Sequence, residues 1–509
     1  MSRWTIVDGR AQGPAVPSGS AKSGSGIVHP MVEGRSAEAV RDSPAGPAVG
    51  RLAPTKYWLF AWLAFLPIAV ARAENFSESD TFWQIRTGIL TLEAGRIPAV
   101  DAFSWTAAGE PWTLNSWGFN VMLAAVYNVS GLPGVALSCA AIVATIIGLV
   151  LFLAREIGAS PAVAGWLLLP TSLLLVIWLS ARPHLVDYLA VLLLVVLLQR
   201  MLDAPSLRQL CALALLVTVW VNLHAASLLG VAIVGGTLVL AGMRKNTRRR
   251  VGWFSGALAV ALLCSLANPY GIGIFSQTTQ VKAASTVITE WQPLNVADPV
   301  QVIPVALGLV ALVVAARRRE IVFSAALLVT LAGSVAAMRI IPILLLISMP
   351  ILMSAASRPS VLRYFESRRR MLVQCGTLAV AAITVLVAFN LPAVGRPDPA
   401  SYPSAAIGAI PAGCTLFNDY MVGGLVILQR PDVRVSLDSR NDLYGAERVN
   451  KFMRFIEHGD GDLAQRLLGA DCVLVPPSSG LARALLTRPE WRLETTESAS
   501  VLFVRVPGS

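Results

Sequence analysis

The stretch from residue 134 to residue 154, GVALSCAAIVATIIGLVLFLA, decides the fold class of this chain because it contains no charged side chain. A helix needs about 20 predominantly apolar residues to cross the hydrocarbon core of a bilayer. The sequence therefore predicts an α-helical polytopic membrane protein with about 11 transmembrane helices. The other ten apolar runs cover residues 57–73, 161–180, 187–202, 207–222, 225–243, 251–267, 300–316, 320–337, 340–356 and 371–391.

The composition agrees with this prediction, since 55% of the 509 residues are hydrophobic, 14% are charged and the mean hydropathy is +0.64. A net charge of +11 could indicate a nucleic-acid partner, so the positions of the basic residues decide the question. They gather in short segments between apolar runs, at residues 244–250, 317–319 and 358–370. This is the positive-inside pattern of a protein in a lipid bilayer, and we expect no nucleic-acid partner.

The basic segments also predict the orientation. With a cytoplasmic N-terminus, the even-numbered helices all end at basic residues, which places the C-terminal region outside the cytoplasm. Residues 117–129 are apolar over too short a length for a span, and counting them as one would invert every later loop. We therefore expect an amphipathic helix at the outer surface, within a long first outer loop at residues 74–133.

The chain divides into three parts by composition. Residues 1–50 are rich in Gly, Ser, Pro and Ala and predict a disordered cytoplasmic tail. Residues 51–391 form the transmembrane domain, and residues 392–509 predict a small extracytoplasmic α/β domain. Its expected strands are 415–417, 433–437 and 472–475 with a hairpin at 491–506, and its expected helices are 444–457, 462–468 and 480–486.

Two cysteines lie in the predicted outer domain. Cys414 and Cys472 fall at the starts of two expected strands. If those strands are parallel neighbours, we expect a disulfide between the two residues.

Two acidic residues of the first outer loop are candidate catalytic groups. Asp80, in the sequence SESDTFWQ, could face a cavity and act as a general base, or it could belong to a solvated acidic loop. Asp101, in RIPAVDAFSW, is the second candidate, and the alternative is an Asx-type turn after Pro98.

Further ionisable residues lie at the predicted outer ends of helices, where such residues are costly and usually face a cavity. Arg182 and Arg339 could bind a lipid-linked phosphate through the guanidinium fork, or they could reach towards lipid headgroups. Three more residues are candidates for substrate binding, although the two histidines among them could be structural: His184, Asp187 and His224.

The outer loop at residues 268–299 adds Glu290 and Trp291 as candidate substrate-binding residues. Glu290 could hold a divalent cation, Mg²⁺ or Mn²⁺, together with Asp80, or it could be an exposed carboxylate. The sequence has no Walker A motif, Rossmann glycine run, His-Glu-x-x-His motif or nucleophile elbow. ATP-driven transport and zinc proteolysis therefore lack their usual sequence support.

Several motifs resemble a group of bacterial multi-pass membrane proteins similar to GT-C-type glycosyltransferases, across residues 57–507. This chain has Phe82-Trp83-Gln84 where the group commonly has Trp-Trp-His, and Asn115-Ser116-Trp117 where the group has His-Glu-Trp. The stretches that carry the resemblance are residues 80–88, 96–105, Pro111-Trp112, Trp117, 417–424 and 436–444.

The resemblance implies a GT-C-like transmembrane domain in a bacterial inner (plasma) membrane. It also implies transfer of a sugar from a polyprenyl-phosphate carrier to an extracytoplasmic glycan, lipid or protein acceptor. Asp80 would then be the catalytic group, Asp101 would orient the acceptor, and Arg182 or Arg339 would stabilise the departing phosphate. Two alternatives stay open: a transporter or flippase of lipid-linked sugars, and a non-catalytic structural subunit of the envelope. A transporter predicts broken helices at paired positions, and apart from Pro170 and Gly235-Gly236 the sequence has no such pattern.

Overall fold

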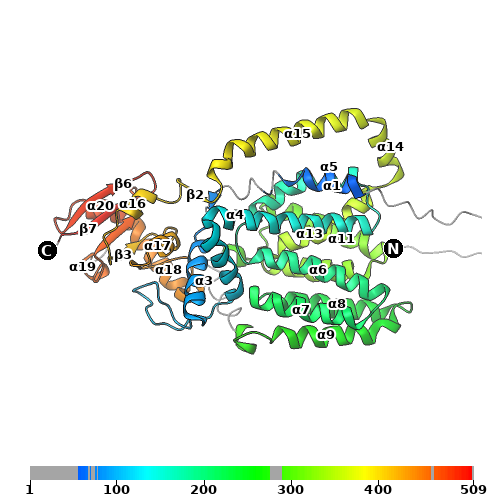
Figure 1. Cartoon of the computed structure of the whole chain (residues 1–509), viewed down its shortest axis with the longest axis horizontal. Coiled ribbons are helices and arrows are strands. Elements are labelled where there is room, and N and C mark those ends of the chain that lie inside the picture. Colours follow the sequence, from blue (N-terminus) through cyan, green and yellow to red (C-terminus); the bar gives the residue numbers. More distant parts are fainter. Residues whose placement is uncertain are drawn as a thin grey trace, which may run out of the picture. The chain divides into compact units, whose positions relative to one another are not determined.

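The computed structural model describes residues 55–66, 69, 75–76, 78–275, 289–459 and 463–506. The tail predicted at residues 1–50 lies outside this set, as does most of the second half of the first predicted span. Within the described residues, all eleven predicted apolar runs fall on helices that form a bundle (Figure 1). These helices are α1 (Thr55–Leu63), α4 (Trp117–Glu156), α5 (Pro161–Leu175), α6 (His184–Asp203), α7 (Leu207–Leu223), α8 (Ser227–Met243), α9 (Val251–Ser265), α11 (Pro299–Arg318), α12 (Ile321–Ala336), α13 (Ile341–Ala356) and α15 (Arg369–Asn390).

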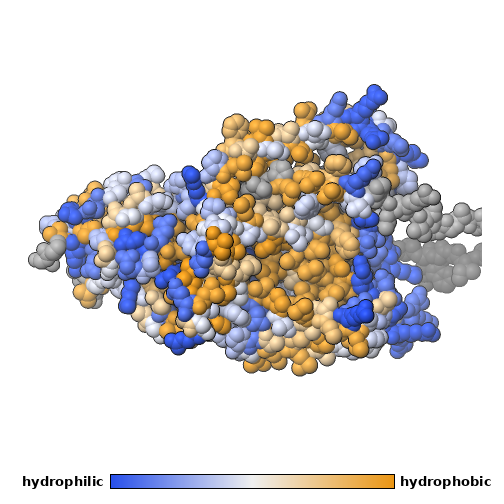
Figure 2. Space-filling view, in the orientation of Figure 1, coloured by the Kyte–Doolittle hydropathy of each residue, from blue (hydrophilic) through white to orange (hydrophobic). Residues whose placement is uncertain are grey.

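Six helical stretches among the described residues are long and apolar enough to cross a membrane. The remaining predicted spans fall on shorter helices, so the number eleven stays a prediction. Figure 2 shows apolar residues over the long helices and hydrophilic residues gathered at the end of the bundle where α14 (Pro359–Ser367) lies. The six stretches are Trp117–Glu156, Pro161–Trp178, His184–Asp203, Pro299–Arg318, Met338–Ala356 and Arg369–Ala393.

Helices α13 and α15 represent the two extremes of packing in the bundle. Almost every residue of α13 from Ile341 to Met353 is buried among other helices. In α15, Val387 is the one residue buried among those that the structure describes, and Figure 1 shows the helix running along the outside of the bundle. Short 3₁₀ helices occur at Val176–Trp178, Arg248–Arg250, Gly271–Phe275, Thr289–Trp291, Met338–Ile340 and Leu391–Ala393.

The helix predicted at residues 117–129 is present as the first segment of α4, separated from the apolar span by a kink. Gly131 has φ 62° and ψ −163°, a conformation open to glycine, and Pro133 follows it. This first segment packs against α3 (Asp80–Ala94) at Gly88, where an added Cβ would lie 2.0 Å from the Asn120 carbonyl oxygen. The close contact fixes α3, and with it Asp80, on the bundle.

The C-terminal region contains a five-stranded mixed sheet in the order β4-β3-β5-β7-β6. Strands β4, β3 and β5 are parallel, whereas β7 is antiparallel to both β5 and β6. The strands are β3 (Thr415–Asn418), β4 (Arg434–Val435), β5 (Cys472–Val475), β6 (Trp491–Thr496) and β7 (Val501–Arg505), and the helices are α16 (Ser404–Gly408), α17 (Gly423–Gln429), α18 (Asn441–His458), α19 (Leu463–Arg466) and α20 (Gly480–Leu485).

The predicted strands and helices of this region are all present, with shifted ends. The strand expected at residues 433–437 is only two residues long, and α18 begins at Asn441, before the expected start at residue 444. The sequence analysis did not predict α16 and α17. Both are short, and the Gly-Gly pair that begins α17 is an unfavourable signal for a helix.

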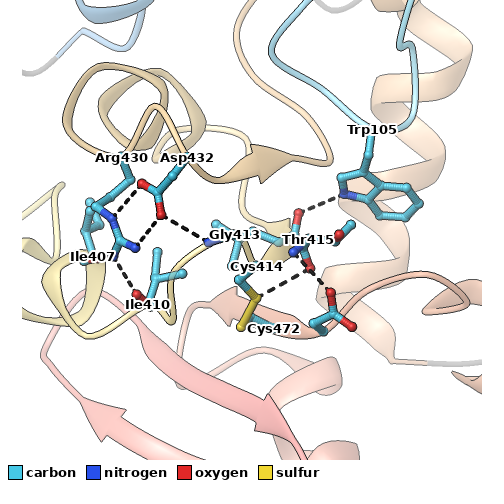
Figure 3. Close-up of a disulfide and its surroundings, with 11 residues drawn as sticks. Trp105, Ile407, Ile410, Gly413, Cys414, Thr415, Arg430, Asp432 and Cys472 are labelled. Carbon is cyan, nitrogen blue, oxygen red and sulfur yellow. Dashed lines mark hydrogen bonds and ion pairs between the residues drawn. A yellow bond between two sulfur atoms is a disulfide. The ribbon is translucent and has the colours of Figure 1, made fainter.

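The expected disulfide between Cys414 and Cys472 is present (Figure 3). Strands β3 and β5 are parallel neighbours with Leu416 opposite Cys472, which brings the two cysteine Cα atoms to 6.3 Å. This separation lies within the range that a disulfide can bridge.

The segment at residues 78–116, within the predicted first outer loop, packs directly on the C-terminal sheet. The Val435 amide donates to the Phe103 carbonyl at 3.1 Å, and the Trp105 amide donates to the Val435 carbonyl at 3.1 Å. At Gly424 an added Cβ would lie 2.2 Å from the Ser79 carbonyl oxygen. A short parallel pair, β1 (Asn75–Phe76) with β2 (Arg396–Pro397), adds a further link. These contacts hold the start of α3 beside the C-terminal domain.

Candidate active site

A cavity of about 420 Å³ lies where the start of α3 meets the C-terminal domain and the loops of the bundle. Its walls come from segments far apart in the sequence, including residues 78–84, 182–184, 290–291 and 420–442. The structure thus brings together seven of the nine predicted site residues. They are Asp80, Arg182, His184, His224, Glu290, Trp291 and Arg339.

Arg182 is the centre of the charged groups in this cavity. Its guanidinium forms ion pairs with Asp80 and Glu290, and its Nε lies 3.2 Å from Glu78 Oε2. The Arg182 side chain is 26% exposed, so the cluster opens to the cavity. Arg182 therefore pairs with three carboxylates, and its expected role in binding a phosphate stays a prediction. Its guanidinium holds the carboxylates close together.

Asp80 occupies the first turn of α3, where the helix dipole favours a negative charge. Trp83 Nε1 donates to Asp80 Oδ1 at 3.2 Å and to Ser439 Oγ at 3.1 Å. Burial alone would raise the pKa of Asp80, but the Arg182 charge and the hydrogen bonds from Ser439, Arg182 and Trp83 together hold this pKa below its ordinary value. Asp80 therefore stays ionised at neutral pH.

Arg339 lies on another wall of the cavity and has a different environment. Its guanidinium carbon is 4.5 Å from the centre of the Trp291 ring, a cation–π contact. Among the residues that the structure describes, no carboxylate forms an ion pair with Arg339. Arg339 therefore differs from Arg182 in having no ion pair among the described residues.

Asp187 does not line the cavity but holds a residue that does. His224 Nδ1 lies 2.7 Å from Asp187 Oδ2, and Trp220 Nε1 donates to Asp187 Oδ1 at 2.8 Å. The pair joins the start of α6 to the end of α7 and fixes the His224 ring. The other histidine, His184, has its Nε2 at 2.9 Å from the Trp178 carbonyl.

The structure places Asp101 outside the cavity, and this corrects its expected role in orienting the acceptor. Its carboxylate accepts hydrogen bonds from the amides of Phe103 at 3.2 Å and Ser104 at 3.0 Å, which is the Asx-type turn that was the alternative interpretation. It also pairs with Arg440 at 2.6 Å, and both side chains are 0% exposed. A carboxylate this deeply buried cannot contact an acceptor in the cavity.

The C-terminal domain contributes a wall of the cavity that was not predicted from the sequence. Tyr420, Ser439, Asn441 and Asp442 line the cavity beside Asp80. The dense polar run at residues 436–442, SLDSRND, was the available signal, but the sequence did not show which of these side chains reach the cavity.

Among the described residues that line the cavity, three have a buried polar atom without a hydrogen-bond partner: Ser79 Oγ, Gln84 Oε1 and Asn441 Oδ1. The two amide oxygens can only accept a hydrogen bond. A buried acceptor without a partner is costly, so a ligand that donates hydrogen bonds would be stabilised here.

The two carboxylates expected to hold a divalent cation do not fit that role in this arrangement. Asp80 and Glu290 both contact the Arg182 guanidinium, whose charge occupies the place between them. Within the described part of the chain, no group of three or more His, Cys, Asp or Glu residues could hold a metal ion.

No protein-family model matches the sequence, and no curated protein matches it. The fold is similar to the crystal structure of ArnT from Cupriavidus metallidurans in the apo state, a GT-C glycosyltransferase. The match has a TM-score of 0.51 and 14% sequence identity, and covers 89% of this chain and 98% of that chain. The GT-C-like fold that the sequence motifs implied is therefore confirmed.

Proposed function

We propose that this protein is a membrane glycosyltransferase that moves a sugar from a polyprenyl-phosphate carrier to an extracytoplasmic acceptor. The observation that carries the proposal is the position of Asp80, which lies with Arg182 in a cavity of an ArnT-like fold. Fold likeness alone does not establish a reaction, so the chemistry of the cavity has to support it.

The cavity has the groups that a sugar donor requires. Trp83 and Trp291 offer aromatic surfaces, and the unpartnered acceptor oxygens of Gln84 and Asn441 suit sugar hydroxyls. Arg339 supplies a guanidinium for the phosphate that leaves with the carrier lipid. These are the contacts expected for a glycosyl phosphate.

Asp80 contributes a fixed negative charge. Glycosyl transfer develops positive charge at the anomeric carbon, and a preorganised carboxylate stabilises that charge. Because the pKa of Asp80 is held low by Arg182, the carboxylate carries this charge throughout the neutral range. The ion pair also holds Asp80 in one position.

The extracytoplasmic location rests on two observations. The basic segments gather at one end of the bundle, which the positive-inside rule assigns to the cytoplasm (Figure 2). The C-terminal domain contains a disulfide, a bond that persists in oxidising compartments. A single cysteine introduced within residues 244–250 should resist an impermeant thiol reagent in intact cells, and efficient labelling there would reverse the orientation.

The test of the proposal is Asp80→Asn in the full-length protein, reconstituted with radiolabelled polyprenyl-phosphate pentoses and hexoses. We expect transfer to fall by at least about 10²-fold while the protein stays folded, because the change keeps the shape and removes the charge. Glu93→Gln, at the exposed far end of the same helix, is the matched control and should keep full activity.

Equal transfer by the Asp80 and Glu93 variants would remove Asp80 from the mechanism. Movement of the intact lipid-linked sugar across the membrane, without transfer to any acceptor, would favour the transporter alternative.

A further inference from the structure

Asp442 is a second carboxyl group in the cavity, and it comes from the opposite end of the chain. It lies in the first turn of α18 and lines the same cavity as Asp80. Trp112 Nε1 donates to Asp442 Oδ2 at 3.1 Å. Trp112 also packs edge-to-face on Trp83, with ring centres 5.5 Å apart, and Trp83 donates to Asp80. The contact between Trp83 and Trp112 therefore links the two carboxyl groups that line the cavity.

The two carboxyl groups have opposite environments. Asp80 is paired with Arg182, whereas Asp442 forms no ion pair with any basic side chain in the described ranges. Burial raises the pKa of Asp442, and the nearby Asp80 charge adds to this, against the Trp112 hydrogen bond and the Arg440 charge, which lower it. Carboxyl groups whose pKa values are driven apart within one site are suited to different roles.

Asn441, next to Asp442, has one amide atom held by a hydrogen bond and one without a partner. Its Nδ2 donates to the Tyr420 hydroxyl at 2.7 Å, which fixes the amide, while its buried Oδ1 has no partner. The first turn of α18 thus presents one free acceptor oxygen and one carboxyl group to the cavity. An alcohol that donates to Asn441 would lie beside Asp442.

We propose that the first turn of α18 is the acceptor subsite, in which Asn441 orients an acceptor hydroxyl and Asp442 takes its proton. The inference rests on the proposed glycosyl transfer. In the step, the acceptor O–H bond breaks and the proton moves to the Asp442 carboxylate. The acceptor oxygen bonds to the anomeric carbon, and the electron pair of the breaking carbon–oxygen bond leaves with the carrier phosphate. The Asp442 proton then passes to water.

Asp80 is less suited to this step. Its low pKa makes it a weak base, and efficient proton transfer needs a group whose pKa approaches the working pH. The charged and titratable groups that line the cavity with Asp442 are Glu78, Asp80, Arg182, His184, His224, Glu290, Arg339 and Tyr420, and Arg440 lies against the Trp112 ring.

The test uses the reconstituted full-length protein and the same panel of polyprenyl-phosphate pentoses and hexoses. Asp442→Asn should lower transfer by about 10²- to 10⁴-fold, the usual contribution of a general base. Asp419→Asn is the matched control, because burial also raises the pKa of Asp419 but this residue does not line the cavity. Asn441→Ala should raise the KM for the acceptor more than it lowers kcat.

The pH profile separates proton transfer from a structural role. A base must be ionised, so the rate should fall as the pH drops through the pKa of Asp442. Trp112→Phe removes a hydrogen bond that lowers this pKa and should move the acidic limb to higher pH. Added formate should partly restore sugar transfer by Asp442→Ala. Such rescue requires a correctly folded site, because formate must replace the missing carboxylate.

An Asp442→Asn variant that keeps wild-type transfer and the same acidic limb would overturn the inference and leave the proposed function intact. Loss of the acidic limb of the pH–rate profile in His224→Gln, with the limb unchanged in Asp442→Asn, would also overturn the inference and leave the proposed function intact. Absence of transfer by the wild-type protein with the whole panel would overturn both.

Discussion

Arg182 and Arg440 each form ion pairs with carboxylates, but Arg182 is partly exposed and Arg440 is fully buried. Arg182 contacts Glu78, Asp80 and Glu290, and 26% of its side chain is exposed to the cavity. Arg440 contacts Asp101 and Asp438, and its side chain is 0% exposed. The comparison shows that two arginine–carboxylate clusters of the same kind differ in their access to the cavity, which only the Arg182 cluster lines.

The environment of Arg440 is that of a complete buried network. Its Nε and Nη2 bind both oxygens of Asp438 at 2.7 and 2.6 Å, and Nη1 binds Asp101 at 2.6 Å. The Tyr444 hydroxyl donates to Asp438 at 2.8 Å, and the Trp112 ring lies 4.7 Å from the guanidinium carbon. Since Asp101 belongs to the predicted first outer loop, this network ties that segment to the C-terminal domain.

The largest effect on folding is expected from Arg440→Met. Removing one partner of a buried ion pair leaves uncompensated charge, here on Asp101 and Asp438, and costs about 3–5 kcal/mol. Thermal unfolding of the purified protein should show the loss as a clear decrease in Tm. A stable variant would mean that the network contributes little to the attachment of the loop.

A smaller loss is expected from Asp101→Asn. Arg440 keeps its two bonds to Asp438, so the cost is that of one weakened buried hydrogen bond, about 1–3 kcal/mol. Transfer per folded molecule should stay within about twofold of wild type, because Asp101 does not reach the cavity. A large loss of kcat with unchanged Tm would restore Asp101 as a site residue.

The smallest effect is expected from Glu110→Gln, which breaks a third pair of the same kind at the surface. Glu110 Oε1 lies 2.9 Å from Arg448 Nη2, with side chains 41% and 33% exposed. Solvent screens such a pair, so we expect a change below about 1 kcal/mol. A decrease in Tm as large as that of Asp101→Asn would show that the exposed fraction of the side chains does not predict how much each ion pair contributes to stability.

The bundle and most of its site could be predicted because both depend on local sequence. Long uncharged runs determine helices that fit a bilayer, and an ionisable residue at the end of such a run, such as Arg182 or His224, is costly unless it faces a cavity. This reasoning does not need the positions of other parts of the chain.

Asp101 and Asp442 show where local sequence stops being sufficient. An aspartate that caps a turn and one that acts in catalysis look alike in a loop. The role of Asp101 is decided by Arg440, 339 positions along the chain. Asp442 reaches the cavity only because the C-terminal domain packs on α3, through contacts such as that between Gly424 and Ser79.

The cavity is lined by an early and a late part of the chain, so it can form only at a late stage of protein synthesis. One wall is encoded at residues 78–84, and the opposite wall at residues 420–442. A growing chain that has inserted every helix up to α15 still lacks the second wall. The site is therefore assembled only after the last helix has been inserted and the C-terminal domain has emerged and folded. A nascent or C-terminally truncated chain would carry Asp80 on α3 without the cavity wall that residues 420–442 contribute.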